Sequence, residues 1–216
     1  MGWDKTFEMG DEIKESDEFV KLFYEKHKSE LKNKKLLDLG CGTGRNALFF
    51  AEKGLDVYAL DKSKTALDIL QKKTKLDKTI YADISKIPSP DNFFDIIIST
   101  WVFHHGKIEQ IKTWLKETTR ILKKEGYFVV DFLSDKDDRS KTGKEIEPNT
   151  RINIIDAIDP EVPHHFFSED DLRDILKDFE ILESKERISK RFNVKEKGEW
   201  KHLNVVARLK GSFNKD

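Results

Sequence analysis

The chain of 216 residues is short of several things: it has one cysteine, five prolines and a formal net charge of −1. Cys41 alone cannot form an intramolecular disulfide, so the fold must depend on its core. Lys and Arg number 40 and Asp and Glu 41, a balance that builds no field to attract a long polyanion. We therefore expect no long nucleic acid as a partner.

Long hydrophobic runs are also missing. No stretch approaches the roughly 18 apolar residues of a membrane span. The first residues, MGWDKTFEMGDE, have neither the basic start nor the apolar centre of a signal peptide. These absences predict a cytoplasmic protein that does not bind membranes.

Charge of both signs is abundant instead. The charged share of 38% exceeds the ordinary share of about a quarter, while the hydrophobic share of 37% can fill one core. A length of 216 residues lies within the range of one α/β unit. We expect residues 1–216 to form a single domain with a densely charged surface.

The most informative segment is LLDLGCGTGRNALFF, residues 36–50. An apolar run that contains Asp38 leads directly into Gly40, Gly42 and Gly44. This pattern predicts a strand, a tight loop and the start of a helix. Glycines allow backbone conformations that a side chain disfavours, and they bring main-chain N–H groups close to a ligand at a helix N-terminus.

A second strand is predicted at 55–60, and Asp61 stands at its end, 21 residues after Gly40. A carboxylate at this place can accept hydrogen bonds from both hydroxyls of a ribose. The nicotinamide-binding fingerprint G-x-G-x-x-G needs its third glycine where this chain has Arg45. The spacing therefore disfavours a nicotinamide cofactor.

Asp38 followed by G-x-G-x-G resembles the first motif of the class I S-adenosylmethionine-dependent methyltransferases. Within that family, residues 44–63 are most similar to the tellurite-resistance methyltransferases and related small-molecule enzymes. The resemblance implies an α/β fold, Rossmann-like and doubly wound. Its mostly parallel seven-stranded sheet would have an antiparallel last strand and helices on both faces. It also implies S-adenosyl-L-methionine as cofactor and S-adenosyl-L-homocysteine as product, but does not fix the methyl acceptor.

The cofactor-binding residues expected from the motif and the resemblance are Asp38, Gly40, Cys41, Gly42, Arg45, Asn46, Asp61, Lys62, Asp83, Ile84 and Thr100. Asp83 matches the acidic residue that binds the adenine amino group, with Ile84 packing on the ring; an Asp that caps the next turn is the alternative. Arg45 and Asn46 would reach the methionine carboxylate, unless Asn46 caps its own helix. Cys41 would meet the ligand through its backbone.

Strands and helices alternate from residue 35 to 133, the pattern of a parallel sheet covered on both faces. Strands are predicted at 36–39, 56–60, 79–81, 93–99 and 127–133, and helices at 44–53, after Ser63 and along 108–122. Later segments at 179–186 and 203–209 are expected to close the sheet as an antiparallel pair. We divide the domain into an N-terminal lid and helix (1–34), the cofactor core (35–133), an acceptor-binding insertion (134–168) and a C-terminal part (169–216).

The acceptor side is expected at the rim of the core and in the insertion, because connections of about 35 residues are uncommon unless they act as lids or binding loops. The expected acceptor-binding residues are Trp101, His104, Arg151 and His165. His105 is the candidate general base, since an imidazole can take the proton of a neutral hydroxyl. An acceptor that is already ionised needs no base, and the histidines would then orient or pack. For residues 134–145, a charged and solvated excursion is the expected structure.

Adjacent histidines point in different directions, and no C-x-x-C or H-x-x-x-H spacing indicates a metal site. The end of the strand at 93–99 lacks the prolines of enzymes that methylate base amino groups and the nucleophilic cysteine of enzymes that methylate pyrimidine carbons. The preferred hypothesis is a small-molecule methyltransferase. The alternatives are a nicotinamide oxidoreductase and a non-catalytic S-adenosylmethionine-binding regulator.

Overall fold

The structure is a computed structural model that describes residues 3–4, 7, 15–155, 157, 159–190 and 199–211. Met9, part of the expected N-terminal lid, lies outside these residues. None of the helices in the described part combines the length and the apolar character needed to cross a membrane.

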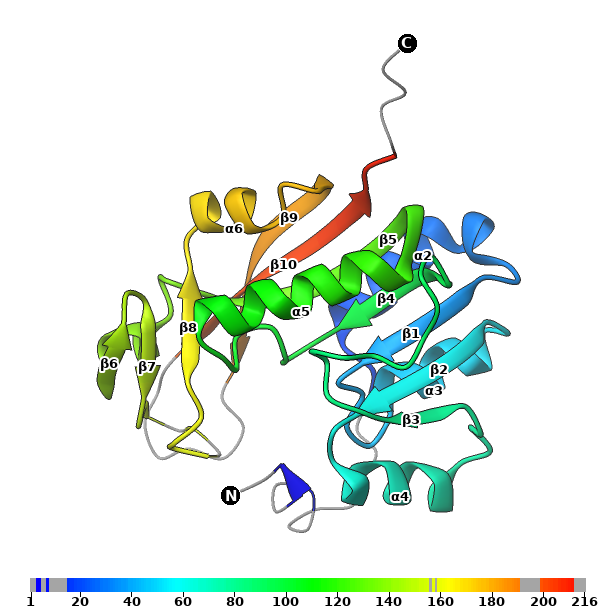
Figure 1. The fold of residues 1–216 in the computed structure, drawn as a ribbon, viewed down its shortest axis with the longest axis horizontal. Coiled ribbons are helices and arrows are strands. Elements are labelled where there is room, and N and C mark those ends of the chain that lie inside the picture. The colour runs from blue at the N-terminus through cyan, green and yellow to red at the C-terminus, as the bar shows by residue number, and fades with distance from the viewer. Residues whose placement is uncertain are drawn as a thin grey trace.

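A mixed sheet forms the centre of the molecule (Figure 1). Its core strands, in spatial order, are β3 (Thr79–Tyr81), β2 (Asp56–Asp61), β1 (Lys35–Leu39), β4 (Phe94–Ser99), β5 (Leu122–Ser134), β10 (Glu199–Leu209) and β9 (Phe179–Lys190). Strands β1 to β5 are parallel, and β10 is antiparallel to both of its neighbours. All seven predicted strands are present, mostly parallel and with the last strand reversed, but the whole sheet has ten strands over the described residues, because three short strands of the insertion join it.

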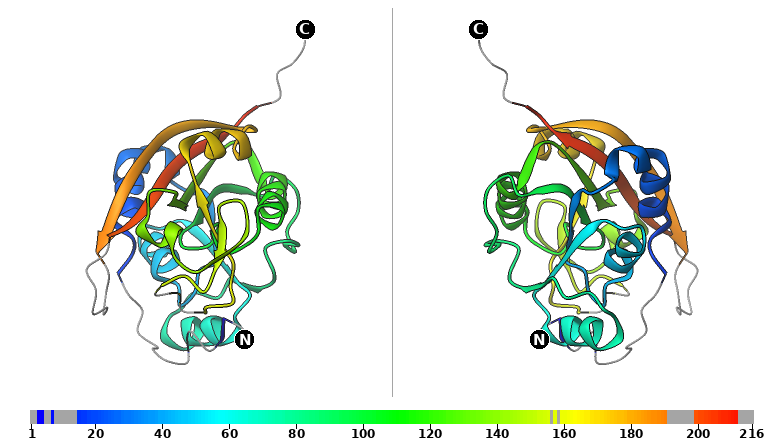
Figure 2. Two further views of the ribbon diagram at one scale, coloured as in Figure 1. Left: turned by 90° about the vertical axis from the view of Figure 1, so that its left-hand side faces the viewer. Right: turned by 90° about the vertical axis from the view of Figure 1, so that its right-hand side faces the viewer.

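Two layers of helices cover the sheet, one on each face (Figure 2). The helices are α2 (Glu18–Leu31), α3 (Arg45–Glu52), α4 (Lys64–Lys73), α5 (Ile108–Ile121) and α6 (Glu169–Ile175). Alternation along β4 shows the division: Ile97 packs in the cluster with residues of α5 and α6, whereas Ile96 and Ile98 pack with residues of α2, α3 and α4. The doubly wound arrangement follows from these central strands being apolar on both faces.

Several helix signals in the sequence act as predicted. The Ser63 hydroxyl accepts a hydrogen bond from the N–H of Ala66 and caps α4. Ser168 and Asp171 form a capping box at the start of α6. The fifth strand is longer than predicted, because β5 begins at Leu122, at the end of α5.

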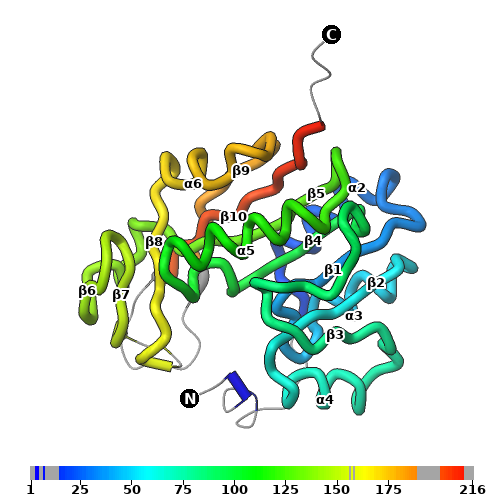
Figure 3. Tube along the Cα trace, viewed as in Figure 1, coloured from blue at the N-terminus to red at the C-terminus, as the bar shows by residue number. Residues whose placement is uncertain are grey.

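The insertion contains regular structure that the sequence did not predict. It holds the 3₁₀ helix η1 (Asp138–Lys141) and the strands β6 (Lys144–Glu147), β7 (Thr150–Ile152) and β8 (His164–Phe167). These strands lie at the opposite end of the molecule from α4 and β3 (Figure 3). The expectation of a solvated excursion at 134–145 is wrong in part, because Asp137 and Arg139 are buried.

Strand β8 joins the insertion (134–168) to the carboxyl end of β5. Leu133 pairs with His202 of β10 on one side and with Phe166 of β8 on the other. Strands β4 and β8 therefore pair with the same side of β5: β4 pairs as far as Val130, and β8 pairs with Leu133 and Ser134, beyond the end of β4. The N–H of His165 donates to the main-chain oxygen of His104 at 2.8 Å, which fixes this position.

Candidate active site

The glycine loop after β1 has the geometry that its sequence predicts. Gly40, Gly42 and Gly44 have φ angles of 75°, 53° and 90°, values that favour glycine. The N–H of Gly40 donates to the main-chain oxygen of Leu60 at 2.8 Å, which ties the loop to the end of β2. A Cβ atom at Gly44 would lie 2.4 Å from Cδ1 of Leu70, so α4 also packs closely against this loop.

Asp61 joins the loop to the start of α4. One carboxylate oxygen accepts the N–H of Gly42 and the other accepts the N–H of Ser63, each at 2.8 Å. Burial raises the pKa of Asp61, although these hydrogen bonds oppose the shift. Each carboxylate oxygen has two lone pairs, so Asp61 retains the capacity to accept ribose hydroxyls.

Asp38 is a second buried carboxylate beneath the loop. It accepts the N–H of Ala47 at 2.9 Å and so holds the first turn of α3. Burial raises the pKa of Asp38 to about 7, and the nearby Asp61 charge adds to the rise. Two buried carboxylates beside a glycine loop favour a cationic ligand with hydroxyl groups. The residues present therefore fit S-adenosylmethionine, which carries an ammonium, a sulfonium and a ribose.

Arg45 and Asn46 converge on Thr100 at the end of β4. Arg45 Nη2 and Asn46 Nδ2 lie 3.2 and 3.0 Å from the Thr100 hydroxyl oxygen. Asn46 Oδ1 accepts hydrogen bonds from the Ser16 hydroxyl and the Asp17 N–H. The alternative that Asn46 caps its own helix is wrong, because Gly44 is the N-cap of α3 and provides no side-chain cap.

The described N-terminal residues lie on the same edge of the sheet. The ring of Phe7 would be 3.2 Å from a Cβ at Gly42, so it approaches the glycine loop closely. Asp4 accepts hydrogen bonds from the Ser63 hydroxyl and the Thr65 N–H at 2.6 and 3.1 Å. The Trp3 ring lies 4.8 Å from the ring of His105 and 5.7 Å from Lys62 Nζ.

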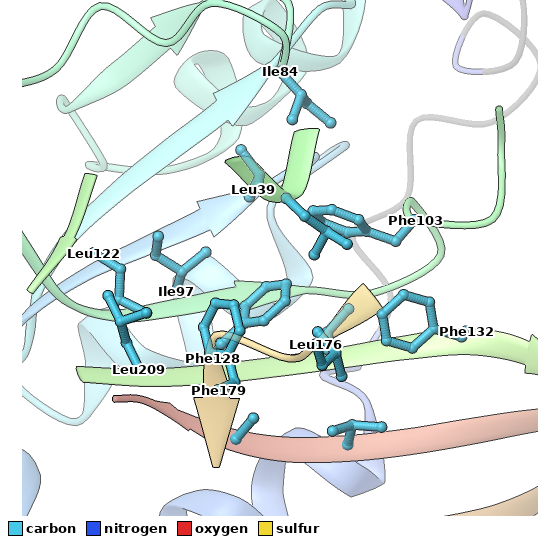
Figure 4. Close-up of a cluster of buried hydrophobic side chains, with 14 of the residues drawn as sticks. Leu39, Ile84, Ile97, Phe103, Leu122, Phe128, Phe132, Leu176, Phe179 and Leu209 are labelled. Atoms are coloured by element: carbon cyan, nitrogen blue, oxygen red, sulfur yellow. The ribbon is translucent and has the colours of Figure 1, made fainter. Parts of the chain in front are cut away.

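Asp83 and Ile84 follow β3. The Asp83 carboxylate accepts hydrogen bonds from the N–H and the hydroxyl of Ser85, so it does cap the following turn. It is exposed and lines a pocket, and this leaves it accessible to a ligand. Ile84 is buried at the edge of the core cluster near Leu39 (Figure 4), and its contact with adenine stays a prediction.

A pocket of about 460 Å³ opens beside these residues. Its walls include Trp3, Lys62, Asp83, His105, Val162 and Pro163. It therefore connects the cofactor side of the edge with His105 and with the segment that precedes β8. The carboxyl edge of a parallel sheet is where ligands bind in open α/β folds.

His105 belongs to a cluster of four histidines, which we call the histidine cluster: His104, His105, His164 and His202. The His105 ring is 4.1 Å from that of His104 and 4.9 Å from that of His164, and the His104 and His202 rings are 5.9 Å apart. Burial lowers the pKa of His104 and of His105 well below 6.5, and that of His164 to about 4. These three imidazoles are therefore neutral near pH 7.

Two of the expected acceptor-binding residues lie elsewhere. His165 points away from the cluster, because successive residues of a strand face opposite sides; its Nδ1 is 2.6 Å from the Thr150 hydroxyl. Arg151 contacts the main-chain oxygen of Thr142 and pairs with Glu145. His164, not His165, joins His104 and His105.

The sequence interpretation missed Asp131 and His202. His202 Nδ1 lies 3.1 Å from one Asp131 oxygen, and the other oxygen accepts the N–H of Trp101 at 2.6 Å. The Trp101 ring is 4.2 Å from that of His202 and 5.3 Å from that of Trp200. One signal was available: Asp131 is the only charged residue in the apolar segment 127–133, and a buried carboxylate needs a partner.

Over the described ranges, no group of three or more His, Cys, Asp or Glu side chains is arranged to hold a metal ion.

Comparison with known proteins finds similarity to methyltransferases. A methyltransferase domain model matches residues 37–130. The probable S-adenosyl-L-methionine-dependent methyltransferase TehB of Haemophilus influenzae is 27% identical over 184 residues, which cover 82% of this chain and 57% of that protein. The chain thus matches little more than half the length of this curated relative.

Solved structures share the fold. A methyltransferase from Methanosarcina mazei has a TM-score of 0.69 at 18% identity, covering 83% of this chain and 93% of that one. A Burkholderia thailandensis 1,6-didemethyltoxoflavin-N1-methyltransferase, with bound 1,6-didemethyltoxoflavin and S-adenosylhomocysteine, has a TM-score of 0.65 at 17% identity, covering 91% and 80%. Residues 37–130 thus match a methyltransferase domain, and the chain shares its fold with S-adenosylmethionine-dependent methyltransferases of known structure.

Proposed function

We propose that this protein transfers a methyl group from S-adenosylmethionine to a small-molecule acceptor. One observation carries the proposal: the Asp61 carboxylate is bonded to the glycine loop at the edge of the sheet where the pocket and the histidine cluster also lie. One fold neighbour supports the acceptor class, because it carries bound 1,6-didemethyltoxoflavin, a small molecule. A cytoplasmic location remains part of the proposal.

The residues of the chain have distinct roles in this proposal. Asp61 binds the ribose hydroxyls, and Asp83 binds the adenine amino group from the rim of the pocket. Asp38 and the main chain of the glycine loop hold the methionine part, with Arg45 and Thr100 next to them. When bound, S-adenosylmethionine supplies an electrophilic methyl group on a positively charged sulfur.

Most of the catalytic effect then comes from positioning. Holding two reactants at near-attack distance can lower a barrier by about 7–11 kcal/mol. Trp3 and Phe7 lie on His105 and the glycine loop, so we include in the proposal that the N-terminal segment acts as a lid. Exclusion of water by a lid strengthens the electrostatic interactions inside the site.

The alternatives have less support. Arg45 stands where a nicotinamide-binding loop has its third glycine. A purely regulatory protein would bind S-adenosylmethionine without methylating any acceptor, so a measurement of methyl transfer separates it from the proposed enzyme.

The test is a calorimetric titration with S-adenosylmethionine, S-adenosylhomocysteine and NAD. We expect saturable binding of the first two and none of NAD. Asp61→Ala should abolish the binding. Asp56→Ala is the matched control, since it removes a carboxylate from the opposite end of the same strand, β2. Binding of NAD alone, or equal affinity of the Asp61→Ala variant, would contradict the proposal.

A further inference from the structure

The histidine cluster has buried nitrogen atoms without a hydrogen-bond partner. Among the described residues, Nδ1 of His104 and Nε2 of His202 have none. Their side chains are almost completely buried, with residue exposures of 1% and 3%. Since unpaired buried polar atoms are costly, two on neighbouring rings mark a place where a ligand group belongs.

The contacts of the Nδ1 atoms determine the tautomers of His202 and His164. His202 Nδ1 faces an Asp131 oxygen, and His164 Nδ1 faces the main-chain oxygen of Val162 at 2.8 Å. Carboxylate and carbonyl oxygens only accept hydrogen bonds. Each Nδ1 therefore carries the hydrogen, and each Nε2 presents a lone pair. His202 and His164 thus offer acceptors and call for a ligand that donates an O–H or N–H.

Two charged groups in the wall of the cluster, Arg139 and Asp131, already have partners. The guanidinium of Arg139 forms a buried ion pair with Asp137 at 2.7 Å and lies 4.4 Å from the Trp200 ring. Asp131 is occupied by His202 and by the N–H of Trp101. Because burial keeps His104, His105 and His164 neutral, no free positive charge remains among these groups to hold an anion.

Aromatic side chains border the cluster. Trp101 and Trp200 pack edge to face, and Trp101 lies against His202. Trp101 has a φ of 63°, which is unusual for a bulky residue and is held by the hydrogen bond from its N–H to Asp131. Flat rings pack well against such walls.

We propose that the histidine cluster is the subsite for a neutral aromatic acceptor with an O–H or N–H nucleophile, and that His202, oriented by Asp131, receives its proton. This inference rests on the proposed methyltransferase function. His105 lies between the pocket and the rest of the cluster, because it lines the pocket and its ring packs against those of His104 and His164. His105, the base expected from the sequence, then forms the entrance.

A lone pair of the acceptor oxygen or nitrogen forms the new bond to the methyl carbon, and the carbon–sulfur bond breaks with its electron pair going to sulfur. The proton of the acceptor passes to His202 Nε2. The resulting imidazolium is paired with the Asp131 carboxylate until the proton is released to water.

Asp131→Asn is the sharpest test, because the N–H of Trp101 determines the orientation of the new amide group. The N–H of Trp101 needs an oxygen, so the amide NH₂ must face His202 and donate to Nδ1. The hydrogen of His202 then moves to Nε2, and the lone pair is lost. Nitrogen-15 NMR of histidine-labelled protein should show the Nδ1–H form of His202 in the parent protein and the Nε2–H form in the variant. The Nε2–H form in the parent protein would overturn the inference.

Binding and turnover complete the test. With S-adenosylhomocysteine bound, catechol should bind saturably and shift the His202 Nε2 signal, whereas benzoate, an anion of similar size, should not. With S-adenosylmethionine, Asp131→Asn and His202→Gln should slow catechol methylation about 100-fold or more and methylation of thiophenol, which ionises unaided, only a few-fold. His165→Gln, which removes a buried imidazole outside the cluster, is the control.

The outcomes separate the two proposals. Failure of S-adenosylhomocysteine to bind contradicts the proposed function, while the NMR tautomer still tests the Asp131–His202 pair. Binding of S-adenosylhomocysteine together with benzoate in preference to catechol overturns the acceptor class. Equal losses for catechol and thiophenol in both variants overturn the proton-acceptor role.

Discussion

The carboxylate of Asp61 accepts a hydrogen bond from the main-chain N–H of Gly42, at 2.8 Å. This contact connects the end of β2 with the loop after β1, so the residue expected to bind the ribose also fixes the loop expected to hold the rest of the cofactor. A change at Asp61 must therefore affect the shape of the site as well as its affinity.

Asp61→Asn tests this double role. Both carboxylate oxygens accept a backbone N–H, so the amide NH₂ of Asn must face one of these donors. We expect the free energy of unfolding to fall by about 1–3 kcal/mol, the cost of a buried group without its partner. Urea unfolding measures the change. Asp83→Asn, at an exposed carboxylate that also accepts an N–H, should change stability by less than 1 kcal/mol, and equal losses in both variants would contradict the argument.

Asp38→Asn should change how stability depends on pH. The pKa of Asp38 is about 7 in the folded protein against an ordinary value of 3.8. Between these values the folded state binds more protons than the unfolded state, so this group's contribution to stability is lost as pH rises from about 4 to 7. The variant should match the parent protein near pH 4 and exceed it by a few kcal/mol at pH 8. Denaturant unfolding across this range would contradict the assignment if the two curves stay parallel.

Gly44→Ala and Gly54→Ala separate backbone strain from steric overlap. The two glycines have φ angles of 90° and 80°, so alanine costs about 1 kcal/mol at each site from the backbone alone. A Cβ at Gly44 would also overlap the Leu70 side chain, whereas nothing lies within 4 Å of one at Gly54. Gly44→Ala should therefore be the more destabilising by at least about 1 kcal/mol in urea unfolding. Adding Leu70→Ala to both variants should remove that difference.

The cofactor half of the site could be predicted because its signals are local. The glycine loop, Asp61 and the cap of α4 at Ser63 all act within a few residues of their own elements. Parallel strands then bring these elements to one edge of the sheet by a general rule of the fold.

The acceptor half depends on pairings between distant segments, which the sequence does not reveal. Strand β8 is short, and its place is determined by two pairs with β5, so the sequence could not decide whether His164 or His165 enters the site. Asp131 meets His202 because Asp131 pairs with Asn204, two residues along β10. A shift of that register by one residue would turn His202 to the other face.

Arg139→Met should destabilise the protein by about 3–5 kcal/mol, because it leaves Asp137 as a buried carboxylate without its cation. The two side chains are 5% and 0% exposed, so solvent screens the pair little. Asp137 also accepts the N–H of Lys201 at 2.7 Å and thereby ties η1 to β10. Adding Asp137→Asn removes the unpaired charge and keeps an oxygen for that N–H, so the double variant should recover much of the loss. Urea unfolding of both single variants and the double variant gives the coupling energy. A stable Arg139→Met protein would show that the ion pair does not hold the wall of the histidine cluster.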